Sequence, residues 1–170
     1  MKTLTLAAAL FVPMALPAQA NVAQLAANAN VIGGLIAVSS IRDLSFGTVP
    51  KGVATTVAPN AATAGAWQVA GSANADVSIT FTLPVVLTNI QALPGSTMPI
   101  TFLATSARWR RATNDPTGAN VFDPNLGVNG RLGPPPNPTL YIWLGGQVNP
   151  ALTAKPGIYV GTAIVTLVYL

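Results

Sequence analysis

The chain of 170 residues contains no cysteine and no histidine, and its acidic residues are four aspartates without a glutamate. The lack of cysteine excludes disulfide bonds, thiolate metal ligands and thiol nucleophiles. The lack of histidine removes the commonest metal ligand and the usual general base. Charged residues make up only 7% of the chain, whereas 51% are hydrophobic. This composition is far from that of disordered chains, and so low a charge indicates a surface that partners cover.

The first twenty residues have the features of a secretory signal peptide. Lys2 supplies the positive start, residues 4–16 are apolar, and Ala18-Gln19-Ala20 matches an A-x-A cleavage signal. The apolar run is short for a membrane anchor, and Pro13 and Pro17 interrupt it. We therefore expect cleavage after Ala20 and a mature chain without a transmembrane span. Its 150 residues suit a single domain.

The basic character of the chain does not predict a nucleic-acid partner. Removal of Lys2 lowers the formal net charge from +4 to +3, and the pI near 10 arises from few charges. A nucleic-acid footprint requires lysine and arginine gathered densely on one face. We expect no nucleic-acid binding.

Alternating segments between Gly, Pro and Asn turns predict an all-β domain over residues 31–170. No stretch after the signal has a helical apolar period, and about eight short strands suggest a two-sheet sandwich. The clearest internal strand is Asp76 to Leu83, in which every second side chain is apolar. Residues 43–49 alternate in the same way.

The segment Gly157 to Leu170 has no charge and no proline, and it predicts one strand roughly 45 Å long. Alternation divides it into two faces, of which one is interrupted by Thr162 and Thr166. The better core-facing set is Gly157, Tyr159, Gly161, Ala163, Val165, Leu167 and Tyr169. A long apolar strand has an edge that must be covered.

Residues 105–138 predict one long loop, because they hold many of the charges and a series of prolines. Within it, Arg108, Trp109, Arg110 and Arg111 form a basic cluster with an aromatic ring. These four residues suit contact with an acidic glycan, a lipid headgroup or a partner carboxylate. The alternative is a solvated strand end whose Trp109 packs inward.

The search for catalytic and metal-binding residues finds no convincing group. Asp43 and Asp76 start strands, and Asp115-Pro116 and Asp123-Pro124 are turn signals. Asn114, Asp115, Asn120 and Asp123 offer oxygens for calcium but do not fit an EF-hand loop. We expect no enzymatic activity, no cofactor and no metal site.

The ending resembles the terminal motif of chaperone–usher pilus subunits, which have a glycine fourteen residues from the C-terminus, here Gly157, and a penultimate tyrosine, here Tyr169. The segments 43–49 (DLSFGTV), 140–146 (LYIWLGG) and 156–161 (PGIYVG) resemble a family of exported bacterial domains of unknown function. That family is similar to pilins and to spore-coat-U-type proteins. The likeness spans roughly residues 28–170.

The resemblance implies a single immunoglobulin-like, pilin-like sandwich that lacks its final strand. In such families a periplasmic chaperone fills the gap, and the N-terminal extension of a neighbouring subunit then replaces it. The core-facing set from Gly157 to Tyr169 would line this groove. The donor would be the arm Asn21 to Asn30, whose best face is Leu25, Ala27, Ala29 and Val31.

Two functional hypotheses follow. The first is a non-enzymatic subunit of a fimbrium or surface structure, assembled by strand complementation with a chaperone, an outer-membrane usher and neighbouring subunits. Such a protein is exported through the inner membrane and passes the periplasm on its way to the cell surface. The second is a self-complete secreted module that binds a glycan or protein partner through the loop at residues 105–138.

Overall fold

The structure, a computed structural model, describes residues 35–91 and 96–170. These residues form β-strands and connecting loops, without a helix among them. Every strand pairing is antiparallel. The predicted all-β fold is therefore confirmed.

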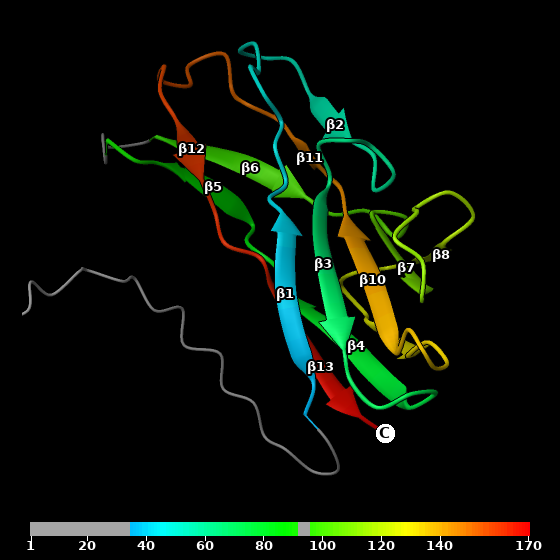
Figure 1. The fold of residues 1–170 in the computed structure, drawn as a ribbon. Helices are drawn as coiled ribbons and strands as arrows, with labels where there is room; N and C mark the ends of the chain where they lie inside the picture. Colours follow the sequence, from blue (N-terminus) through cyan, green and yellow to red (C-terminus); the bar gives the residue numbers. More distant parts are fainter. Residues whose placement is uncertain (1–34, 92–95) are drawn as a thin grey trace, which may run out of the picture.

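Two sheets pack face to face and make the main sandwich (Figure 1). The larger sheet contains, in spatial order, β1 (Ala37–Arg42), β3 (Gly65–Ala70), β10 (Thr139–Leu144), β7 (Ala107–Arg111) and β8 (Asn120–Phe122). The smaller sheet contains β13 (Ile164–Tyr169), β4 (Asp76–Thr82) and β9 (Val128–Arg131).

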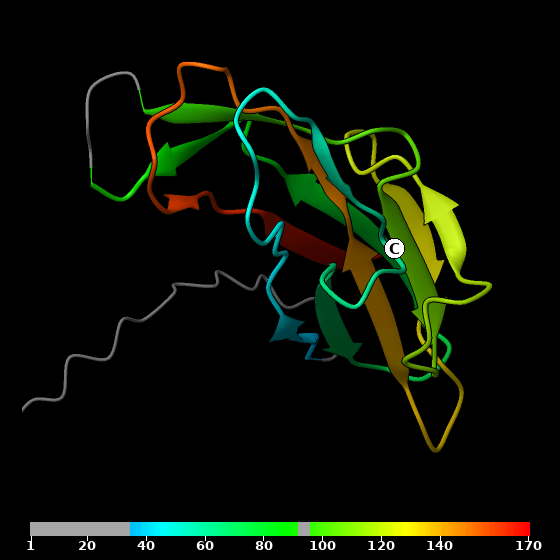
Figure 2. The same ribbon diagram turned by 90° about the horizontal axis from the view of Figure 1, so that it is seen from above.

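A third sheet extends from one end of the sandwich (Figures 1 and 2). Its strands, in spatial order, are β12 (Tyr159–Val160), β5 (Val86–Asn89), β6 (Thr97–Thr101), β11 (Gly146–Val148) and β2 (Thr55–Val57). The chain passes into the third sheet from both sheets of the sandwich. From the larger sheet, β10 continues through Gly145 into β11. From the smaller sheet, β4 continues through residues 83–85 into β5. The third sheet and the sandwich thus share continuous lengths of chain.

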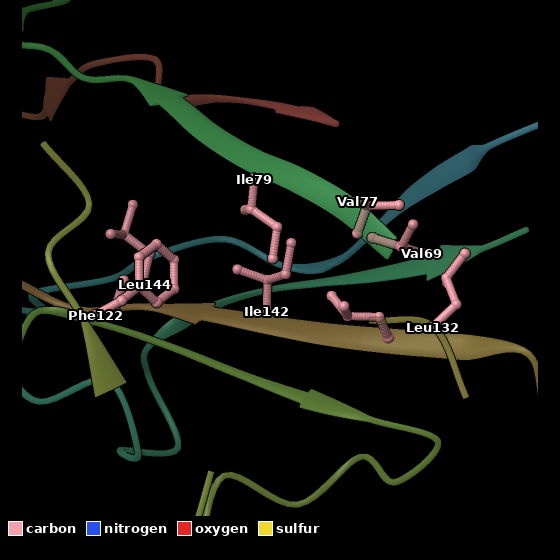
Figure 3. Packing of buried hydrophobic residues seen from close by; sticks show 9 residues of the cluster. Val69, Val77, Ile79, Phe122, Leu132, Ile142 and Leu144 are labelled. Atoms are coloured by element: carbon pink, nitrogen blue, oxygen red, sulfur yellow. The ribbon is translucent and has the colours of Figure 1, made fainter. Parts of the chain in front are cut away.

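The main core lies between β4 and β10. Ile79 of β4 points toward Ile142 of β10, and Val77 of β4 lies beside Val69 of β3 (Figure 3); all four side chains are fully buried. Alternation produces this arrangement, since residues two apart on a strand face the same layer. Phe81, two residues further along β4, stacks on Phe122 with ring centroids 6.2 Å apart.

The prediction of one long loop at residues 105–138 is wrong, because β7, β8 and β9 all lie in it. The charged residues of β7 belong to an alternating strand pattern. Ala107 and Trp109 pack on the core, and Arg108 and Arg110 lie between them on the outer face. Pro116 and Pro124 lie in the connections between these strands, and the prolines at residues 134–138 lie between β9 and β10.

The prediction of one continuous terminal strand is also wrong. The segment divides into β12, which pairs with β5, and β13, which pairs with β4. The break lies opposite Pro84, which has no N–H to donate to a neighbouring strand. Gly161 lies in the break, and a Cβ there would come within 2.6 Å of Leu87 Cδ2. The terminal segment therefore moves from the third sheet into the sandwich at a glycine.

We predict that Ile142→Ala lowers the free energy of unfolding by about 2–5 kcal/mol, because it leaves a cavity between two packed layers. Chemical denaturation followed by tryptophan fluorescence measures the change. Ser39→Ala on the exposed strand β1 is the control and should change stability by less than about 0.5 kcal/mol. Equal losses in the two variants would contradict the assigned core.

Candidate functional site

In the terminal segment, strand β13 has a neighbouring strand along one of its two edges, and its inner face is partly exposed. Val165 and Leu167 pack against the core yet remain partly exposed, whereas Ile79, directly opposite Leu167 on β4, is fully buried. On its other flank, β13 pairs with no strand among the described residues. The inward side chains of β13 therefore border an opening in the sandwich.

The main chain of β13 also points into this opening. The Leu170 N–H donates to the Asp76 carbonyl at 3.1 Å, so the even-numbered residues of β13 direct their N–H and C=O groups to β4. By alternation, Val165, Leu167 and Tyr169 direct theirs away from β4. The residues with inward side chains thus also present main-chain donors and acceptors to an incoming strand.

Strand β1 presents a second edge of the same kind. The Gly71 N–H donates to the Pro138 carbonyl at 3.2 Å. The odd-numbered residues of β3 therefore direct their main-chain N–H and C=O groups to β10, and the even-numbered residues direct theirs to β1. Ala70 lies opposite Ala37, so Ala37 and Ser39 bond to β3, and the register shifts between Ser40 and Arg42. Ile36, Val38 and Ser40 therefore direct their main-chain groups away from β3. The same residues face the core side, since Val38 lies opposite the buried Val69.

Near the third sheet the opening widens into a groove of about 900 Å³. Its walls are residues 43–51 on one side and residues 154–161 with Ala163 on the other. Its floor is apolar and is formed by Trp67, Leu87, Met98, Ile100, Phe102 and Val148. Charged side chains contribute little to the groove, because Asp43, Lys51 and Lys155 are the charged members of the lining among the described residues.

The wall at residues 43–51 is an unpaired segment, which corrects the expectation that residues 43–49 form a strand. Leu44, Phe46 and Val49 still turn partly inward, and Phe46 and Val49 pack on Met98 and Ile100. One main-chain hydrogen bond, from Ser45 N–H to the Thr63 carbonyl at 2.9 Å, attaches this wall to the domain. The strand pattern is present, but no neighbouring strand lies there among the described residues.

Gly157 begins the opposite wall at a turn that other residues would not tolerate. Its φ of +146° and the close approach of the Asn89 side-chain amide to its Cα leave no room for a Cβ. Asn89 is buried, and its carboxamide accepts from the Gln91 N–H at 2.9 Å and donates to the Pro156 carbonyl at 3.4 Å. These contacts fix the start of the wall on β5.

Tyr169 narrows the opposite end of the opening. Its hydroxyl accepts a hydrogen bond from the Ser72 N–H at 2.8 Å and lies where a Cβ on Gly71 would be. The ring therefore reaches from the smaller sheet to the end of β3, next to where β1 begins. The opening is wide at the third sheet and narrow at Tyr169.

The structure brings together the predicted groove residues along one inner face. Gly157, Tyr159, Gly161 and Ala163 line the wide groove, and Val165, Leu167 and Tyr169 continue the face to the narrow end. The predicted donor residues Leu25, Ala27, Ala29 and Val31 lie outside the described residues. Sequence reasoning missed the wall at residues 43–51 and the floor, although the alternation at Leu44 and Phe46 was a usable signal.

The basic cluster does not form one contact surface. Trp109 lies on the core side, near Gly130, while Arg111 is exposed. Arg108 donates to the Pro116 carbonyl at 3.0 Å, and Arg110 donates to the Thr117 carbonyl at 2.6 Å and to the Asp115 carboxylate at 3.1 Å. This geometry agrees with the alternative interpretation of the cluster, a strand end whose Trp109 packs inward.

The described residues contain no group of three or more His, Cys, Asp or Glu side chains that could hold a metal ion. In the same part of the chain, no helix has the length and apolarity needed to span a membrane.

Comparisons with known proteins give little that is specific. No protein-family model matches the chain, and no curated protein matches it. Among solved structures it is similar to a chain from a study of a chaperone–tip adhesin complex in the biogenesis of CFA/I fimbriae, with 12% identity and a TM-score of 0.44. The alignment covers 79% of this chain but 42% of the other, so this chain matches less than half of that protein's length.

We predict that Tyr169→Phe lowers the free energy of unfolding by about 0.5–1.5 kcal/mol, because it removes the hydrogen bond to Ser72 and keeps the ring. Hydrogen exchange should show faster exchange of the Ser72 amide. Tyr141→Phe is a matched control for loss of a phenol, since its hydroxyl is not among the hydrogen-bonding groups of the described residues. Unchanged exchange at Ser72 would contradict the contact.

The Thr117 N–H hydrogen bond to the Asp115 carboxylate lowers the pKa of Asp115 below 3.8, and Arg110 lowers it further. The stability this provides is present above the unfolded-state pKa and is lost as pH falls through the folded-state pKa. An NMR titration should place the Asp115 midpoint below 3.8, and Arg110→Gln should move it upward. A midpoint above 3.8 in the native protein would contradict this geometry.

Proposed function

We propose that this protein is an exported, non-enzymatic structural subunit of a fimbrium or other surface structure, and that a β-strand from a partner completes its sandwich. The observation that carries the proposal is the opening between β1 and β13. Among the described residues, neither edge pairs with a further strand, and the inward apolar side chains of both edges pack against the same buried cluster. A strand is an occupant that satisfies both requirements together.

The chemistry of the groove supports a peptide strand over a small charged ligand. The floor is aliphatic and aromatic, and the lining has few charges. The inner face from Tyr159 to Tyr169 continues well beyond the wide groove, so the opening is elongated. An extended segment with alternating apolar residues fits such a site, because its main chain bonds to the edges and alternate side chains enter the core.

The partners in this proposal come from the resemblance to chaperone–usher pilins. A periplasmic chaperone would occupy the opening first, an outer-membrane usher would receive the complex, and a neighbouring subunit would then supply the permanent strand. The protein would pass through the periplasm and end at the cell surface. The alternative of a self-complete module that binds through residues 105–138 is less favoured, because that segment contains sandwich strands and Arg108 and Arg110 bond within the domain.

We predict that an extended peptide binds the mature protein and protects the amides of Val165, Leu167 and Tyr169 from hydrogen exchange. The probe is a synthetic peptide of about twelve residues, alternating isoleucine and threonine with lysines at both ends to limit self-association. Leu167→Asp should weaken binding at least about tenfold, because it places an unpaired charge in the strand-binding face. The neighbouring Val168→Asp is the matched control, since Val168 is 57% exposed on the opposite face.

Near-ultraviolet circular dichroism establishes whether each variant remains folded. If Leu167→Asp unfolds the protein, Ala163→Asp on the groove wall provides the same test at a second position of the same face. Full protection of the three amides in the isolated monomer, without peptide, would contradict an open edge. Equal loss of binding in Leu167→Asp and Val168→Asp would contradict the assigned face.

A further inference from the structure

We propose that the strand that completes the sandwich comes from a different protein and carries an aspartate or glutamate side chain at its third-sheet end. In this arrangement the carboxylate lies between Lys51 and Lys155, which are on the two facing walls of the groove. The inference rests on the proposed function, in which the opening accepts a strand. It adds the charge of that strand, and it sets aside residues 21–34 of a second copy as its source.

The two lysines lie at the same end of the groove. Lys51 precedes Gly52, whose N–H donates to the Pro150 carbonyl at 2.9 Å. This contact joins the first wall of the groove to the chain between β11 and β12. Lys155 lies on that chain, and its carbonyl accepts a hydrogen bond from the Tyr159 hydroxyl at 2.6 Å. Both lysines are therefore beside the third sheet, where the two walls meet (Figure 1).

Within the part of the chain that the structure describes, neither lysine forms an ion pair with a carboxylate. Asp76 and Asp115 are each paired with an arginine. Asp123 accepts hydrogen bonds within its own turn. The remaining aspartate, Asp43, begins the wall that ends at Lys51. The two ammonium groups are therefore available to a carboxylate from outside the domain.

Asp43 gives the opposite end of the groove the opposite charge. It directly follows β1 of the larger sheet, whereas Lys51 is eight residues further on, at most roughly 26 Å of extended chain. The neighbouring Arg42 does not line the groove, because its guanidinium donates to the Ala64 carbonyl at 2.7 Å. An acidic side chain is thus attracted at the third sheet and repelled near the sandwich. Charge therefore determines which end of an incoming strand lies at the third sheet.

The expected gain in affinity is moderate, because both lysines are exposed. Exposed ion pairs are individually weak, and salt screens them. The floor between the walls is apolar and includes Met98, Ile100 and Val148, so the lysines are the groups that hold a carboxylate at this end. Attraction of an acidic end, compared with repulsion of a basic end, amounts to a preference of about tenfold at low salt.

The sequence shows that residues 21–34 of a second copy do not supply this carboxylate. They contain neither aspartate nor glutamate, and the four aspartates of the chain all belong to the described domain. Binding of residues 21–34 from a second copy therefore gains nothing from Lys51 and Lys155. The occupant whose charge matches the groove is a segment of another protein with an acidic end.

Two kinds of peptide that differ at one end test the inference on the mature protein. The first is the alternating isoleucine–threonine probe described above, with lysines at both ends. The second carries two glutamates in place of the lysines at one end, and it is made with the glutamates at either the N-terminal or the C-terminal end. All are acetylated and amidated, so that charged termini do not contribute. The better glutamate peptide should bind about tenfold more tightly than the lysine peptide at low salt, and less than about twofold more tightly at about 0.5 M salt.

Variants of the groove show whether the two lysines cause this preference. Lys51→Gln and Lys155→Gln should each reduce it about threefold. Arg111→Gln is the matched control, since it removes one positive charge from an exposed side chain outside the groove lining and should leave the preference unchanged. In the double variant Lys51→Glu with Lys155→Glu, the preference should reverse, and the lysine peptide should bind more tightly.

The remaining outcomes separate failure of this inference from failure of the proposed function. Equal binding of the two kinds of peptide, with the Leu167 amide protected from hydrogen exchange, would overturn the inference and leave the proposed function intact. An equal effect of Arg111→Gln and Lys51→Gln would reduce the preference to attraction by net charge and would also overturn it. Tighter binding of a peptide of residues 21–34 would identify a second copy as the occupant. If no peptide binds, the proposed function fails and the inference fails with it.

Discussion

The unsatisfied edge of β13 is the constraint on which the rest of the structure depends. Main-chain N–H and C=O groups at the border of a hydrophobic core must be paired, and an apolar strand that ends a sheet favours pairing with another chain. Here both the polar and the apolar requirements arise at the same residues, Val165, Leu167 and Tyr169. The partly exposed inner face and the wall at residues 43–51, which pairs with no strand among the described residues, are the surfaces that an incoming strand would cover in the proposed function.

The unusual composition has a related physical origin. A soluble monomer normally covers its surface with charges of both signs, and this chain has few. Outward residues of the terminal segment such as Ile158, Ile164 and Val168 are more than half exposed. A subunit within an assembly hides much of such surface against its neighbours. The low charge and the open edge thus favour the same kind of molecule.

The sequence predicted the fold class and the inner face of the terminal segment, because both depend on local alternation. Val77 and Ile79 face the core as their spacing requires, and Tyr159 to Tyr169 do so across two strands. The break at Gly161 was not predictable, since it depends on Pro84, which lies far away in the sequence, in the connection between β4 and β5. Strands β7 to β9 were missed because Arg108 and Arg110 find their partners within the domain, which composition alone does not show. The wall at residues 43–51 was visible as a pattern, but its lack of a neighbour is a property of the whole fold.

The order in which the strands pair has a consequence for how the chain folds. β13 pairs with β4, and Tyr169 meets Val77 across more than half of the sequence, while β10 pairs with the distant β3. The hairpin of β5 and β6 is among the few local pairings. Domains built from such long-range contacts fold on the millisecond-to-second scale, and their apolar strands are exposed to aggregation meanwhile. If the chain is exported as proposed, its most vulnerable interval comes directly after export, when a protein that shields exposed strands would have the greatest effect on yield.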